Sequence, residues 1–141
     1  MVQLYFLSVL CNGLIGYILF ARDIDEGDLA ENSSCPLGLP VNTPTFLLGL
    51  SVLSIATGVL KLFSTMHGAP ILGDLLPAAA GVIGGFCLLF GVYRQKTSNP
   101  VDSGSKLDRL GIALMGNRKI LGILLLSAAL LHFLFPDAFF L

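Results

Sequence analysis

Residues 74–93 read DLLPAAAGVIGGFCLLFGVY, a run of twenty residues in which Asp74 carries the only charge. A helix rises about 1.5 Å per residue and the hydrocarbon core of a bilayer is about 30 Å thick, so about 20 apolar residues span a membrane. In lipid, a helix satisfies every backbone polar group internally, whereas an open strand does not. The stretch therefore predicts a transmembrane helix.

Three further apolar stretches accompany it along the chain. Residues 2–21 and 120–135 contain no charged residue, and residues 45–65 contain only Lys61. The last stretch is short unless Arg118 and Lys119 extend from its start to the interface. We therefore predict an all-α, single-domain membrane bundle over 1–141, with transmembrane helices at about 2–21, 45–65, 74–93 and 120–135. A short interfacial helix is predicted at 106–115.

The composition excludes several classes of protein. Of the 141 residues 12% are charged, and the mean hydropathy is +0.85. A soluble domain averages about 25% charged residues, so the chain is neither a soluble globular domain nor disordered. A net charge of −1 gives no affinity for a phosphate backbone, so no nucleic-acid partner is expected. The expected surroundings are the lipid bilayer.

The basic residues predict the orientation in the membrane. Seven of the eight Lys and Arg residues lie in the loops 22–44 and 94–119, and the eighth is Lys61. Loops with an excess of Lys and Arg stay in the cytoplasm. Both loops are therefore predicted to be cytoplasmic and both termini outside, in the cell (inner) membrane. The loop 22–44 also carries five acidic residues, which could pair with the basic loop: Asp23, Asp25, Glu26, Asp28 and Glu31.

Small residues in the stretch 74–93 predict close helix contacts. Small side chains let backbones approach in lipid, where leucine packed on leucine gains nothing. One helical face carries Pro77, Ala80, Gly84, Cys87 and Gly91, and the adjoining face carries Gly81 and Gly85. We therefore place this helix at the centre, begin it with Asp74 as N-cap, and expect a leucine at Gly84 to clash with a neighbouring backbone.

Polar stripes follow the helical period in the first two predicted helices. These residues are candidates to bind a ligand or line a pore: Ser8 and Asn12 in the first helix, and Ser51, Ser54 and Lys61 in the second. A mid-membrane amide without partners costs several kcal/mol, so Asn12 must face protein or water. The two stripes are predicted to face each other or a shared cavity; the alternative is hydrogen bonding between helices.

The remaining ionisable residues of the apolar region gather near the outer end of the predicted bundle. This outer polar cluster comprises Lys61, His67, Asp74 and His132. Ionisable residues at membrane depth are functional candidates by default. The cluster allows a Lys61–Asp74 pair or a metal site of the other three residues, but no spacing is typical of a metal site. We therefore predict no metal, identify no catalytic residue, and name no cofactor.

Two segments resemble the DoxX-like small four-helix membrane proteins. GVLKL at 58–62 ends one helix, and GGFCLLFG at 84–91 follows in the next. The chain differs from that pattern in having a helix before these segments, and in having Val82 and Ile83 where an acidic residue often precedes the double glycine. The resemblance implies a four-helix membrane fold and a role in assembly or redox processes.

Three functions are compatible with these features. A non-catalytic subunit or assembly partner of a membrane complex is favoured by the small size, the small-residue faces and the lack of a catalytic motif. An oligomeric transporter or channel for a small solute would use the polar stripes. A membrane-embedded enzyme would use the outer polar cluster. A protein partner or a homo-oligomer is expected in the first two cases.

Overall fold

The computed structural model describes residues 2–21, 43–65, 71–96 and 105–134. Over these residues the chain forms five α-helices and no strand: α1 (Val2–Ala21), α2 (Pro44–Thr65), α3 (Ile71–Lys96), α4 (Lys106–Gly116) and α5 (Arg118–Leu134). The all-α fold predicted from the sequence is therefore confirmed, and each predicted apolar stretch corresponds to one helix.

The helix bounds differ from the prediction mainly in α3. Helix α3 begins at Ile71 and ends at Lys96, so it extends three residues beyond the predicted stretch 74–93 at each end. Asp74 thus lies within the first turn instead of capping it, and Pro77 is inside the helix. The expected N-cap role of Asp74 is wrong, because Ile71, Leu72 and Gly73 continue the helix ahead of it.

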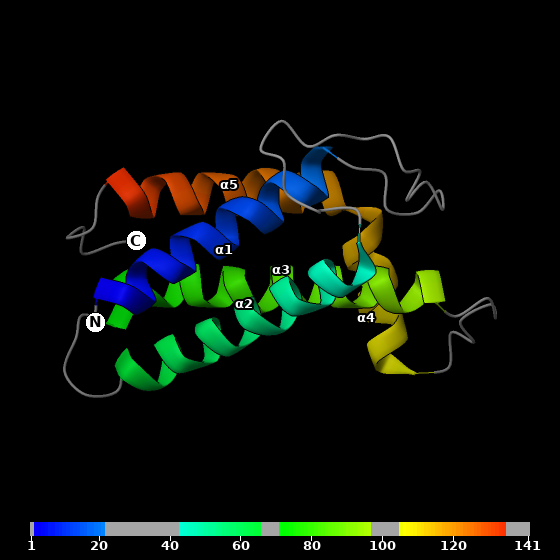
Figure 1. Ribbon diagram of the computed structural model, residues 1–141, viewed down its shortest axis with the longest axis horizontal. Coiled ribbons are helices and arrows are strands. Elements are labelled where there is room, and N and C mark those ends of the chain that lie inside the picture. Colours follow the sequence, from blue (N-terminus) through cyan, green and yellow to red (C-terminus); the bar gives the residue numbers. More distant parts are fainter. Residues whose placement is uncertain (1, 22–42, 66–70, 97–104, 135–141) are drawn as a thin grey trace.

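The four long helices form two layers, as Figure 1 shows. One layer contains α1 and α5, and the other contains α2 and α3. The start of α1, the end of α2, the start of α3 and the end of α5 lie at one end of the bundle, here called the Lys61 end. The opposite end is crossed by α4 and is called the α4 end.

Each layer is held by backbones in direct contact. A Cβ atom on Gly16 would lie 2.9 Å from the carbonyl oxygen of Gly122, and one on Gly122 would lie 2.8 Å from that of Gly16. In the other layer, a Cβ on Gly58 would lie 2.7 Å from the oxygen of Ala78. Only glycine allows these approaches, which make α1–α5 and α2–α3 the two tight pairs of the fold.

The central position of α3 is confirmed. It contacts all four other helices. The face that carries Gly81 and Gly85 meets α2, because a Cβ on Gly85 would lie 2.9 Å from the backbone carbonyl oxygen of Ser51. Its other small face meets the first layer, where a Cβ on Gly84 would approach side-chain atoms of Leu125 and Ile15 at 2.8–3.2 Å. The neighbours of Gly84 are therefore side chains, and not the backbone that we expected from the sequence. Of the other small residues predicted to pack, Ala80 is half-buried, and Gly81 and Gly91 are buried.

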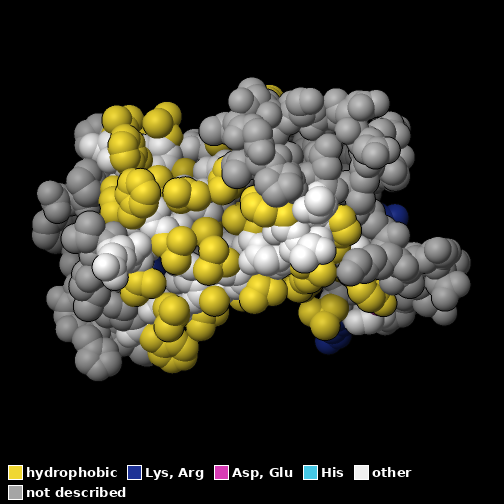
Figure 2. Space-filling view, viewed as in Figure 1, with side chains coloured by type: hydrophobic (Ala, Val, Ile, Leu, Met, Phe, Trp, Pro, Cys, Tyr) yellow, Lys and Arg dark blue, Asp and Glu magenta, His cyan; other side chains and the backbone are white. Residues whose placement is uncertain are grey.

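The outer surface of the helices is strongly apolar. Large hydrophobic side chains are exposed on all five helices, and Figure 2 shows them across the described part of one face. Three helices, α1, α2 and α3, are long and apolar enough to cross a membrane. The pair α4–α5, bent by 77°, makes a fourth if it is counted as one span.

Candidate functional site

A lysine and a histidine meet inside the bundle at the Lys61 end. Lys61 is four residues from the end of α2, and His132 is two residues from the end of α5. The Nζ atom of Lys61 lies 2.9 Å from Nε2 of His132. Their exposed fractions are 4% and 3%, so this hydrogen bond is buried.

Tyr5 of α1 closes the site. Its ring lies 4.6 Å from the imidazole of His132, centroid to centroid, at an interplanar angle of 51°. The Nζ atom of Lys61 lies 5.6 Å from the centroid of the same ring, within the range of a cation–π interaction. The Tyr5 hydroxyl donates to the carbonyl oxygen of His132. Three helices thus each contribute one side chain to what we call the Tyr5–Lys61–His132 site.

The chemistry of this site follows from the two facing nitrogen atoms. An ammonium only donates hydrogen bonds, whereas an imidazole nitrogen donates or accepts according to its protonation. The 2.9 Å contact therefore needs one hydrogen between Nζ and Nε2: Lys61 Nζ donates to an unprotonated Nε2, or a protonated Nε2 donates to the lone pair of a neutral amine. The site combines this lysine–histidine pair with the face of an aromatic ring.

Two members of the polar stripes bind the backbone of α3. Asn12 Nδ2 donates to the carbonyl oxygen of Pro77 at 2.9 Å, and Ser54 Oγ donates to that of Gly81 at 2.9 Å. Asn12 is 1% exposed, and a Cβ on Gly81 would lie 3.2 Å from its Oδ1 atom. The absence of a side chain at Gly81 therefore makes room for the amide.

The other stripe residues are buried as well. Ser51 Oγ donates to the carbonyl oxygen of Leu48 at 2.8 Å. Thr57, a buried residue of α2 outside the predicted stripe, donates its hydroxyl to the carbonyl oxygen of Leu53 at 2.7 Å. Ser8 is also buried. The stripes of α1 and α2 were expected to face each other or a shared cavity, with hydrogen bonding between helices as the alternative. Asn12 and Ser54 follow the alternative, because both donate to carbonyl oxygens of α3 that are one turn apart.

The structure brings together part of the outer polar cluster. Lys61 and His132 are in contact, whereas His67 and the side chain of Asp74 lie outside the described residues. Tyr5 was not among the candidate site residues, although it shares a helical face with Ser8 and Asn12; that spacing was the signal that could have identified it. No three His, Cys, Asp or Glu side chains of the described segments could hold one metal ion.

The polar interior does not extend toward the α4 end within the described part of the bundle. Apolar side chains fill that half of the core: Ile15, Ile18, Leu19, Leu47, Leu50 and Leu88. These side chains interlock between α1, α2 and α3. A path for a polar solute along the axis of a single copy would have to displace them.

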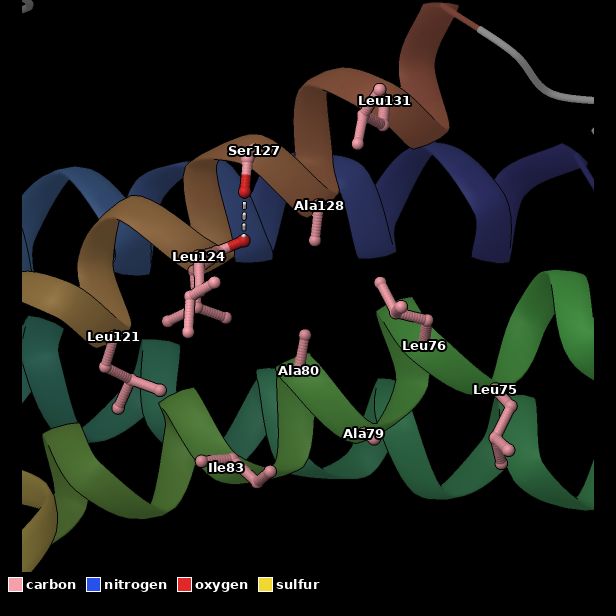
Figure 3. A pocket seen from close by; sticks show the side chains of 11 residues that line it. Leu75, Leu76, Ala79, Ala80, Ile83, Leu121, Leu124, Ser127, Ala128 and Leu131 are labelled. Atoms are coloured by element: carbon pink, nitrogen blue, oxygen red, sulfur yellow. Dashed lines mark hydrogen bonds between the residues drawn. The ribbon is translucent and has the colours of Figure 1, made fainter. Parts of the chain in front are cut away.

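A second feature is an apolar groove between α3 and α5, which we call the α3–α5 groove. Its volume is about 570 Å³, and its lining comes only from these two helices. Figure 3 shows Ala80 and Ala128 facing each other across it, with Leu76 and Leu124 beside them. Ser127 at its edge donates to the carbonyl oxygen of Leu124 at 2.9 Å. The lining thus combines three alanines with larger aliphatic side chains.

Comparison with known proteins gives a family and no function. A family model of an uncharacterized family matches residues 1–132. An uncharacterized protein of Treponema pallidum (strain Nichols) is 35% identical over 142 residues, which cover 100% of both chains. No solved structure is significantly similar to the chain. The similarity extends over the whole bundle and is not confined to one segment.

Proposed function

The chain belongs to the same family as the Treponema pallidum protein, and we propose that it is an integral membrane protein acting as a non-catalytic subunit of a membrane complex. The observation that carries the proposal is the α3–α5 groove.

The placement in the membrane is supported by the helix lengths and by the charges. Helices α1, α2 and α3 are long and apolar enough to span, and α5 with 17 residues is about 25 Å long. Arg118 and Lys119 at its start extend its reach by snorkelling to the interface. The α4 end carries exposed Arg94, Lys106 and Arg109, so this end is proposed to face the cytoplasm and both termini the outside.

The small residues that line the α3–α5 groove favour a helix as its occupant. A lipid chain fills any apolar groove. Alanines in the lining also allow the backbone of another helix to approach closely, which is typical of helix contacts in membranes. Ala79, Ala80 and Ala128 line the groove, and the lining residue Leu124 is 59% exposed. The proposed occupant is one transmembrane helix of a different membrane protein.

Crosslinking in native membranes tests this proposal. A photoreactive residue in place of Leu124, in the groove, should give one adduct of defined mass, and one in place of Leu53, exposed on α2, should not. Ala80→Leu fills the groove and should lower the adduct yield about tenfold, since overpacking costs more than about 1.4 kcal/mol. Ala56→Leu is the matched control, because Ala56 is exposed on α2 outside the groove.

The identity of the adduct decides the outcome. Native mass spectrometry of the gently released complex should recover the same larger protein that is crosslinked at Leu124. Equal adducts from Leu124 and Leu53 would show that the groove is not the docking surface. An adduct of two copies of this chain would replace the proposed partner by a homodimer.

The Tyr5–Lys61–His132 site favours a second candidate, an oligomeric transporter of a small solute. Its buried titratable pair is the kind of group that marks a solute or proton path in membranes. Lys61→Met and Asn12→Leu should then abolish solute flux into proteoliposomes when flux is compared at equal amounts of folded protein. Retained flux in both variants would exclude this candidate.

A further inference from the structure

The hydrogen bond between Lys61 and His132 joins the two layers of the bundle. Lys61 belongs to α2 and His132 to α5, and these two helices have no extended contact within the described segments. Glycine contacts hold each layer together, whereas this bond crosses from one layer to the other at the Lys61 end. A change in the bond therefore acts on the distance between the layers at this end.

The contact holds one proton fewer than the two groups can carry together. An ammonium and an imidazolium both only donate hydrogen bonds, so neither Nζ nor Nε2 accepts when both groups are charged. Two positive charges would then lie 2.9 Å apart, on side chains that are 4% and 3% exposed and that water screens little. Addition of the second proton therefore breaks the contact.

The imidazole determines the pH range of this change. Histidine is the side chain whose charge ordinarily changes between about pH 5 and 8. When the layers separate at the Lys61 end, water reaches both nitrogen atoms, and the separated groups bind two protons where the contact holds one. The arrangement that binds more protons is favoured as the pH falls. Acid therefore favours separation, and alkaline pH favours the contact.

The separation is limited by contacts deeper in the bundle. Asn12 Nδ2 donates to the Pro77 carbonyl oxygen across the layers, and this bond between neutral groups does not titrate. Toward the α4 end, the apolar core continues between α1, α2 and α3. Ser8 is buried and lies between Tyr5 and Asn12 on one face of α1, so it is a polar residue that separation would expose.

Ionisable groups from the neighbouring helices affect this change. Tyr5, Lys61 and His132 are the only ionisable side chains of the described residues at the Lys61 end, one each from α1, α2 and α5. The Tyr5 ring lies against the imidazole, and its hydroxyl donates to the His132 carbonyl oxygen. The sequence adds three ionisable residues whose side chains lie outside the described ones: His67, Asp74 and Asp137. A carboxylate beside the pair would stabilise the second proton, so Asp74 on α3 needs its own variant.

We propose that the Lys61–His132 contact is a pH-sensitive switch: uptake of the second proton separates α2 from α5 and opens the Lys61 end of the bundle. In the proposed orientation this end faces the outside, so the switch responds to external acid. The inference goes beyond both proposed functions, and it requires neither a partner helix nor a transported solute.

Pulsed electron paramagnetic resonance on the full chain in detergent measures the separation. The three native cysteines are replaced by alanine, and spin labels are placed at Leu60 on α2 and Leu130 on α5, which are 54% and 59% exposed. As the pH falls from about 8 to about 5, the ratio of long to short distances should rise by up to about tenfold per pH unit, the limit for uptake of one proton. Labels at Gly49 and Ile120, exposed near the α4 end, should keep a single distance.

Two conservative substitutions identify the groups responsible. His132→Gln and Lys61→Gln each leave a side chain that forms hydrogen bonds at the contact and remove one of the two charges. Both proteins should keep the short distance over the whole pH range; where one does not fold, the other decides. A parent protein with no increase in the long distance at acid pH would overturn the proposal, and so would an increase that persists in either variant.

Asp74→Asn separates the nitrogen pair from a Lys61–Asp74 ion pair. The acid response should persist in this variant, or begin at a higher pH if the carboxylate stabilises the second proton. Loss of the response would show that protonation of Asp74 is its cause and would overturn the proposal. None of these results bears on crosslinking at Leu124, so the switch and the proposed partner fail independently.

Discussion

Gly122→Ala is expected to lower the free energy of unfolding by about 1–3 kcal/mol, the usual cost of overpacking. The new methyl group would lie 2.7 Å from the backbone nitrogen of Phe20 and 2.8 Å from the oxygen of Gly16. Backbone atoms cannot turn aside as a side chain does, so α1 and α5 must separate. Unfolding of the detergent-solubilised protein by sodium dodecyl sulfate, followed by circular dichroism, measures the loss.

Gly49→Ala is the matched control for this prediction. A Cβ on Gly49 meets nothing within 4 Å, so the same substitution adds only helix propensity, worth up to about 1 kcal/mol in stability. Gly84→Ala should lie between the two, because the ends of the Leu125 side chain can move. Equal unfolding curves for Gly122→Ala and Gly49→Ala would contradict the close contact of α1 with α5.

The second large effect is expected at the buried nitrogen pair. Lys61→Met and His132→Leu should each destabilise the bundle by about 1–3 kcal/mol, because each leaves the polar partner buried without the 2.9 Å hydrogen bond. The double variant removes both ends of that bond. Its loss should be smaller than the sum of the single losses by about 1–2 kcal/mol.

The same unfolding assay checks this double-mutant cycle. Tyr5→Phe serves as the control, since it keeps the ring against His132 and removes only the hydroxyl that donates to the His132 carbonyl. Its expected cost is about 1 kcal/mol, the net value of one hydrogen bond. Additive losses for Lys61→Met and His132→Leu would show that the two side chains do not depend on each other.

The elements of the fold were predictable because hydropathy is a local property. The stretches 2–21 and 45–65 match α1 and α2 within one residue at each end. The beginning of α3 was placed too late, because Asp74 looks like a cap when the three apolar residues before it are assigned to a loop. The central position of α3 followed from two faces of small residues on one helix.

The pairing of the helices was not predictable in the same way. Gly16 and Gly122 belong to helices at opposite ends of the chain, and only their spatial contact makes them a pair. The sequence also drew attention to the α1 and α2 stripes without showing that Asn12 and Ser54 bond to backbone carbonyls of α3. Both features depend on contacts between residues more than 25 positions apart, which periodicity within one helix does not contain.

The pairing of α1 with α5 has a consequence for how the protein is made. Ribosomes produce α1 first and α5 last, so α1 is complete long before its closest packing partner exists. Helices α2 and α3 are synthesised in between, and α3 carries the Pro77 carbonyl oxygen that accepts from Asn12. The helix that accepts the hydrogen bond from α1 is therefore synthesised before the helix that packs closest to α1, and the first layer is complete only when α5 has been made.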